Sequence, residues 1–135
     1  MPCRELTSDE YAVLDKLKSA YLIYQQNFVP ENKDVPFNTK TIDLVFFRCA
    51  KQEHVLENNI VAVTAFALGH NFIQHLGYSW KINEDYLGKE YVLESSDGVH
   101  VIYPFSLVQQ KFDKHECGFV KKLSEMYYDL KLNSI

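Results

Sequence analysis

One stretch, residues 57–77, is the most apolar part of the chain and constrains the fold more than any other. Its apolar residues recur at intervals of three or four, which places one set on a single helix face: Val61, Ala65, Leu68, Phe72 and Leu76. A track of small residues, Ala62, Ala65 and Gly69, runs alongside and lets a neighbouring element approach closely. The polar stripe is narrow, so we expect a central helix that is covered on most sides. Gly77 tolerates a left-handed conformation and marks its end.

Two further helices are expected before this one. Residues 7–10, Thr-Ser-Asp-Glu, form a capping box that starts a helix running to about Gln26. Residues 29–38 hold two prolines and several polar residues, which is typical of a loop. A second helix is predicted from Thr39 or Thr41 through Cys49, although residues 44–47 alone also suit a strand.

After Gly77 the apolar period changes to two. Residues 78–82 alternate as in a half-buried strand, with Tyr78, Trp80 and Ile82 on one face. Residues 83–88 suggest a turn, and short strands are expected at 91–93 and 99–103. Residues 95–98 end in Asp-Gly, a strong signal for the connection of a hairpin. These strands would form a three-stranded antiparallel meander onto which the central helix packs.

Two short helical patterns complete the chain. Pro104 is expected to close the sheet, with Ser106 and Gln109 capping a helix through Val108 and Phe112. Asp113 and Glu116 suggest a cap for a last helix, whose inward residues are expected to be Phe119, Leu123, Met126 (or Tyr127) and Leu130. We therefore predict one α+β domain over residues 1–135.

Charge and composition narrow the function classes. Lys and Arg number 14 against 18 Asp and Glu, a net charge of -4, which disfavours nucleic acid and favours a basic partner. The first residues carry no apolar signal-peptide core, and no apolar run approaches the roughly 20 residues that span a bilayer. We therefore expect a cytoplasmic protein outside the membrane. The three cysteines share no metal-ligand spacing and are expected to be reduced thiols.

The polar residues of the central helix offer one candidate for catalysis. His70 and His75 are about 140° apart around a helix, so they cannot chelate one ion together. Asn71, Gln74 and His75 do lie close on one side. An enzyme of unfamiliar type could use this stripe with a carboxylate of the meander. We expect no metal and no cofactor, because no cluster or fingerprint for either occurs.

The strongest local charge bias lies between residues 84 and 97, a segment that contains five carboxylates and only one lysine. We expect the carboxylates to project from the sheet face that does not cover the helices. A basic partner would dock there, with Tyr86 or Tyr91 as its aromatic anchor. The alternative is a solvated acidic edge that prevents pairing with other chains. The candidate partner-binding residues are Glu84, Asp85, Tyr86, Glu90, Tyr91, Glu94 and Asp97.

An ordered set of features between about residues 65 and 130 resembles a bacterial family of small domains of unknown function. These features are a glycine-bearing apolar helix (Ala67-Leu68-Gly69), Leu76-Gly77, Trp80, an acidic turn ending at Gly88, Pro104-Phe105-Ser106, Lys111, and a closing helix with Leu123 and Tyr127. The resemblance implies a shared fold and carries no catalytic residue over to this chain.

Three functions remain open from the sequence. The first is a non-catalytic cytoplasmic binding protein, most specifically an immunity (antitoxin-like) protein that neutralises a basic toxin domain by contact. The second is the enzyme described above. The third is a structural or regulatory module that forms homo-oligomers through the tyrosine-rich first helix. The sequence does not indicate an oligomeric state.

Overall fold

The computed structural model describes residues 3–32 and 34–133. Helices come first, a sheet follows, and helices close the chain, which confirms the predicted α+β class. The elements are α1 (Ser8–Phe28), a short 3-10 helix η1 (Pro30–Asn32), α2 (Thr39–Ala50), α3 (Glu57–Leu76), β1 (Ser79–Asp85), β2 (Gly88–Glu94), β3 (Val101–Ile102), α4 (Pro104–Asp113) and α5 (Phe119–Asn133). Within the described residues, no helix combines the length and apolar character needed to cross a membrane.

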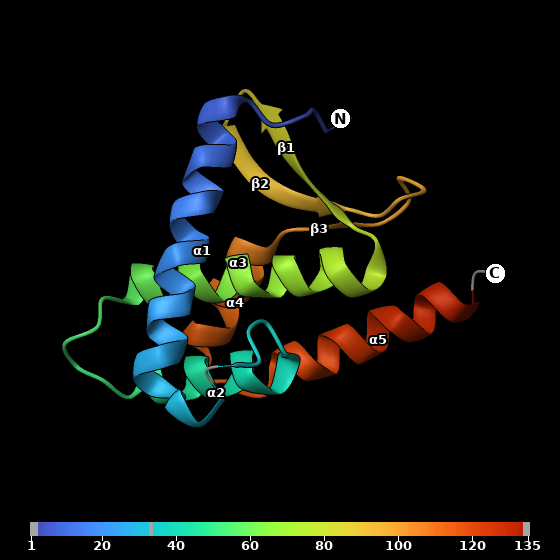
Figure 1. The fold of residues 1–135 in the computed structure, drawn as a ribbon. Coiled ribbons are helices and arrows are strands. Elements are labelled where there is room, and N and C mark those ends of the chain that lie inside the picture. Colours follow the sequence, from blue (N-terminus) through green and yellow to red (C-terminus); the bar gives the residue numbers. More distant parts are fainter. Residues whose placement is uncertain (1–2, 33, 134–135) are drawn as a thin grey trace.

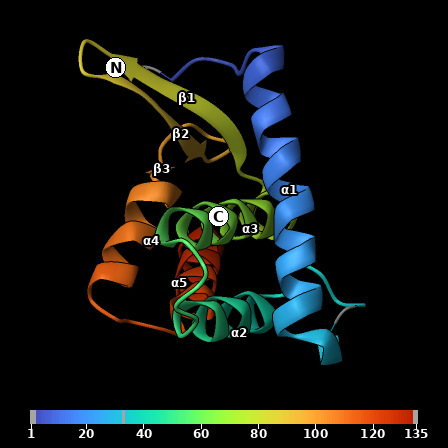
Figure 2. The same ribbon diagram turned by 90° about the vertical axis from the view of Figure 1, so that its left-hand side faces the viewer.

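Helix α3 forms the centre of the molecule, as its apolar pattern predicts. It lies between α1 and α4, with the sheet on one side and α2 and α5 on the other (Figures 1 and 2). Ala65, Ala67 and Leu68 are completely buried. Gly77 adopts φ 74° and ends the helix in the left-handed region.

Gly69 lies where the sheet meets α3. A Cβ atom built on Gly69 would clash with the Trp80 indole ring, which β1 places against the helix. The ring stacks on Phe66 with 6.3 Å between centroids. The small-residue track therefore receives a large side chain from the sheet.

The first two helices have local caps. The Thr7 hydroxyl accepts a hydrogen bond from the Glu10 backbone N–H, and the Glu10 carboxylate accepts one from the Thr7 N–H at 2.8 Å. This is the predicted capping box. Helix α2 begins at Thr39, where the Asn38 side chain accepts from the Lys40 and Thr41 N–H groups. Residues 44–47 belong to this helix and form no strand.

The sheet has the order β1-β2-β3 and is antiparallel throughout. Residues 83–85, which the sequence suggests are a turn, belong to β1 and pair with residues 88–90. The turn contains only Tyr86 and Leu87, because cross-strand pairing continues to Asp85 and Gly88. Strand β3 is shorter than predicted and pairs only with Leu93 and Glu94. Arg4 forms an isolated bridge with Ile82 on the free edge of β1.

The predicted caps of the last two helices are wrong. Helix α4 starts at Pro104, whose missing N–H suits the first turn, and Ser106 instead donates its hydroxyl to Glu90. Asp43 of α2 caps α5 by accepting hydrogen bonds from the Val120 and Lys121 N–H groups at 2.9 and 3.0 Å.

The inward face of α5 also differs in part from the prediction. Phe119 is buried and Leu123 is half-buried, but Met126 and Leu130 are 49% and 45% exposed. Tyr127, the stated alternative to Met126, packs edge-on against Phe72 with 5.5 Å between centroids. The end of α5 extends past the helices that cover its start (Figure 1), and Tyr128 and Leu132 are about half exposed there. Leu130 lines a small cavity with Leu76 and Tyr78.

Candidate functional site

The β1–β2 hairpin is fixed to the start of the chain by a network of charged side chains. Arg4 contacts both Glu10 and Glu84 at 2.8 Å, and Lys89 contacts Glu10 at 3.1 Å. Hydrogen bonds from Arg4, Thr7 and Lys89 hold the pKa of the Glu10 carboxyl well below its usual range. Glu10 is buried, whereas Glu84 and Lys89 are exposed. The hairpin is therefore anchored to α1 before it reaches its tip.

The tip itself consists of Asp85, Tyr86 and Leu87, which we call the hairpin tip. The Asp85 carboxylate accepts a hydrogen bond from the Leu87 N–H at 2.8 Å and closes the turn. Gly88 follows with φ 139°, which favours glycine. Tyr86 is 95% exposed and Leu87 is 81% exposed. The tip of the hairpin lies away from α3 and α4 (Figure 2), and both side chains are almost fully in solvent.

Tyr91, the other predicted anchor, has a structural role. Its ring packs against Phe105 and Trp80, with centroids 5.9 and 6.2 Å away. Its hydroxyl donates to the Glu10 carbonyl oxygen at 2.8 Å. The side chain is half-buried on the face of the sheet that covers the helices. Of the two tyrosines, only Tyr86 exposes most of its ring to solvent.

The remaining carboxylates do not share one face. The register places Asp85, Glu90 and Glu94 on the outer face, whereas Glu84 points to the helix side with Lys89. Glu90 accepts the Ser106 hydroxyl at 2.6 Å. Asp97 lies in the β2–β3 connection, where it accepts from the Ser95 hydroxyl and the Val99 N–H at 2.6 and 3.0 Å. These hydrogen bonds keep the pKa of Asp97 low.

The structure separates the residues of the polar stripe on α3. Asn71 is buried, donates to the Phe37 carbonyl at 2.9 Å and accepts from the Ser124 hydroxyl at 3.3 Å. Gln74 and His75 are exposed on the helix surface. Asn71 therefore connects α3 to the loop before α2 and to α5. Across residues 3–32 and 34–133, no three His, Cys, Asp or Glu side chains are grouped so as to hold a metal ion.

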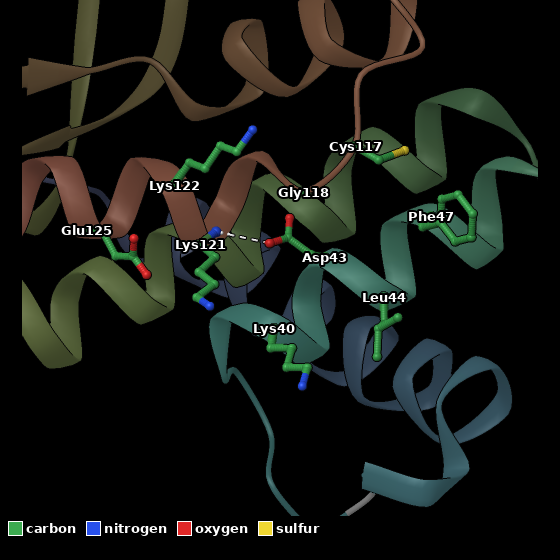
Figure 3. Close-up of a pocket in the computed structure, with 9 residues that line it drawn as sticks. All are labelled: Lys40, Asp43, Leu44, Phe47, Cys117, Gly118, Lys121, Lys122 and Glu125. Atoms are coloured by element: carbon green, nitrogen blue, oxygen red, sulfur yellow. Dashed lines mark hydrogen bonds between the residues drawn. The ribbon is translucent and has the colours of Figure 1, made fainter.

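A groove between α2 and α5 was not anticipated from the sequence. Its volume is about 630 Å³, and we call it the α2–α5 groove (Figure 3). Burial raises the pKa of Asp43 at its base, against two backbone hydrogen bonds that lower it. The residues that line it are Lys40, Asp43, Leu44, Phe47, Cys117, Gly118, Lys121, Lys122 and Glu125. The only sequence signal for this groove is the spacing of Lys40, Asp43, Leu44 and Phe47, which places the four residues on one face of a helix.

This arrangement is that of a small α+β protein in which a braced hairpin projects from a helical body. The chain belongs to a family described as "Domain of unknown function (DUF3806)", whose sequence model matches residues 47–123. The match starts before α3 and ends in the first turns of α5, and it is consistent with the resemblance found from the sequence. Comparison with curated proteins gave no match, and neither did comparison with solved structures.

Proposed function

We propose that this chain is a non-catalytic binding protein that captures a basic protein partner through the hairpin tip. The more specific form of the proposal is an immunity (antitoxin-like) protein that neutralises a toxin domain by contact. One observation carries it: Tyr86 and Leu87 are 95% and 81% exposed at the end of a braced hairpin. Large apolar side chains held in water in this way are typical anchors of protein interfaces.

The bracing supports this function because it reduces the entropy lost on binding. All residues of β1 pair with β2 up to the turn, and Asp85 closes the turn. Arg4 then connects the hairpin to Glu10 at the start of α1. An anchor that is ordered before association loses little conformational freedom on binding.

The charge near the tip supports a basic partner. Asp85 lies at the tip and Glu90 two residue pairs further along the hairpin, whereas Glu94 pairs with Ser79 at its far end. All three carboxylates are on the outer face, which also carries Lys81. Carboxylates around an apolar anchor attract a basic surface and speed its capture. An immunity protein needs such a complementary surface and no reactive group. The proposed activity therefore requires only complementary shape and charge.

The test uses the protein encoded by the gene beside that of this chain as the candidate partner. The two are expressed together and separately, and growth and the dissociation constant of the purified pair are measured. We expect the neighbour to inhibit growth alone and to be harmless with this chain. Removing both anchors in the variant Tyr86→Ser/Leu87→Ser should weaken binding about 100-fold or more, the scale expected for interface anchors.

Leu56→Ser is the matched control, because Leu56 is also an exposed leucine, 68% exposed, but lies before α3. This variant should bind and protect like the wild type. A harmless neighbour, or one that is toxic and does not bind, would rule out the immunity assignment for this pair. Equal binding by the tip variant and the wild type would place the interface elsewhere.

A further inference from the structure

The α2–α5 groove lies beside a second cavity. This cavity has a volume of about 280 Å³ and is lined mainly by apolar residues: Phe46, Phe47, Ala50, Lys51, Phe112, His115 and Cys117. Phe47 and Cys117 also line the groove, so the two spaces share a wall. Phe46 and Phe112 meet edge-on with 6.3 Å between their centroids. We call the groove and this neighbouring cavity together the cleft; the second cavity is its aromatic end.

The groove end of the cleft has a small excess of positive charge, with three lysines against the carboxylates of Asp43 and Glu125. Three lysines, Lys40, Lys121 and Lys122, line the groove from both helices. Among the described residues, none of the three forms an ion pair with a carboxylate. Asp43 directs its two oxygens to the N–H groups of α5, which leaves Glu125 as the other carboxylate of the lining. The chain has a net charge of -4, so this positive site is a local feature.

Most of the charged side chains lie at one end of the groove and the apolar ones at the other. Figure 3 shows Lys121, Lys122 and Glu125 on one side of Asp43, Leu44 and Phe47 on the other, and Lys40 below Asp43 beside Leu44. Phe47 is 40% exposed, and the Lys51 ammonium lies over its ring at 3.9 Å from the centroid. A ligand that covers Phe47 would remove this aromatic surface from water.

We propose that the cleft binds a free, single-chain carboxylate amphiphile, such as a medium-chain or long-chain fatty acid. The carboxylate would lie between Lys40 and Lys121, and the alkyl chain would run past Leu44 and Phe47 toward the second cavity. The volume is in the range of small-molecule sites, and compact ammonium groups suit a compact anion. This binding goes beyond the proposed function, because the cleft contains no residue of the hairpin tip.

The test titrates dodecanoate, below its micelle-forming concentration, into the full chain by isothermal titration calorimetry. We expect saturable binding that weakens with added salt. The charge reversal Lys40→Glu/Lys121→Glu should weaken it about tenfold or more, because both head-group contacts become repulsive. The matched control is Lys16→Glu/Lys18→Glu, which makes the same charge change at exposed positions of α1 and should bind like the wild type.

Further ligands test the apolar end. Affinity should rise from octanoate to dodecanoate, by about fourfold at most for each methylene that becomes buried. The variant Phe47→Ser should reduce this gain, and dodecyltrimethylammonium should not bind. No saturable binding of dodecanoate, or equal binding by the charge-reversal variant, would overturn the proposal.

Two further measurements separate this site from the other possibilities. Vesicles with anionic phospholipid test a membrane surface: binding to them without binding of free dodecanoate would also overturn the proposal. The Tyr86→Ser/Leu87→Ser variant should bind dodecanoate like the wild type. Failure of the hairpin as a partner site and failure of the cleft as a ligand site can thus be told apart.

Discussion

Gly69 shows how one residue can fix the contact between the sheet and the central helix. A glycine inside a helix is usually unfavourable by about 1 kcal/mol relative to alanine. Here the Trp80 indole occupies the space that a side chain would fill, so the absence of a side chain permits a large buried contact. At this position, therefore, glycine is favoured over alanine.

We predict that Gly69→Ala destabilises the protein by about 1–3 kcal/mol, and Gly69→Leu by at least as much, because both overpack this contact. Urea unfolding midpoints measure the change. The double variant Gly69→Ala/Trp80→Leu provides the control, since a smaller residue at position 80 should restore part of the loss. An unchanged midpoint in Gly69→Ala would show that the indole does not lie on the helix in solution.

Glu10 gives stability a defined dependence on pH. Its folded pKa lies below the ordinary carboxyl value, mainly because Arg4 donates to it. The stabilisation is therefore present above the ordinary pKa and is lost as the pH falls toward the folded value. Protonation of Glu10 removes the negative charge with which both Arg4 and Lys89 form ion pairs.

We predict that Glu10→Gln lowers the melting temperature at pH 7 and makes it fall less between pH 7 and pH 3. Glutamine keeps an oxygen for the Thr7 N–H but loses the charge. Thermal unfolding across this pH range measures both effects. Glu53→Gln, at an exposed position between α2 and α3, should follow the wild-type curve. Parallel curves for Glu10→Gln and wild type would contradict the role given to Glu10.

At the scale of elements, the sequence predicts what neighbouring residues determine. The three-to-four-residue spacing of α3 and the capping box of α1 are local patterns, and the structure confirms both. The end of β1 depends on pairing with β2. Residues 83–85 are polar and therefore look like a turn in the sequence, but they pair with residues 88–90. The α5 cap comes from Asp43, 77 residues away from Val120, so no local pattern reveals it.

The candidate site follows the same division. Sequence spacing identifies the acidic segment, but strand register decides that Glu84 faces the helices and Tyr91 packs inside. Tyr86 and Tyr91 look equivalent until the two-residue turn places one of them outside. The α2–α5 groove depends on two helices meeting through a distant cap, so it becomes visible only in the structure.

We predict that Asp43→Ala destabilises the protein by about 0.5–2 kcal/mol, the usual range for loss of a helix cap. Two N–H groups of α5 lose their acceptor in this variant. Urea unfolding measures the loss, and amide exchange should become faster in the first turn of α5. Asp129→Ala, at an exposed position near the end of α5, should leave stability almost unchanged. Unchanged exchange in Asp43→Ala would show that another group caps the helix.

At the scale of the whole molecule, the two candidate sites lie at opposite ends. The hairpin rises beyond one side of α3, whereas α2 and the start of α5 lie on the other side (Figure 1). The hairpin carries an excess of carboxylates, and the groove an excess of lysines. A partner approaching in solution would therefore be oriented by the charge asymmetry before contact.

The last prediction tests this orientation with the candidate partner used for the hairpin tip. The variant Asp85→Asn/Glu94→Gln removes two outer-face charges and keeps the Asp85 oxygen that closes the turn. Glu84 is left intact because it pairs with Arg4. We expect slower association and a flatter dependence on ionic strength, with the dissociation rate and the stability nearly unchanged. Asp113→Asn/Glu125→Gln makes the same charge change at the end of α4 and on α5 and should associate at the wild-type rate. Equal slowing by both variants would show that net charge, and not the hairpin, guides the partner.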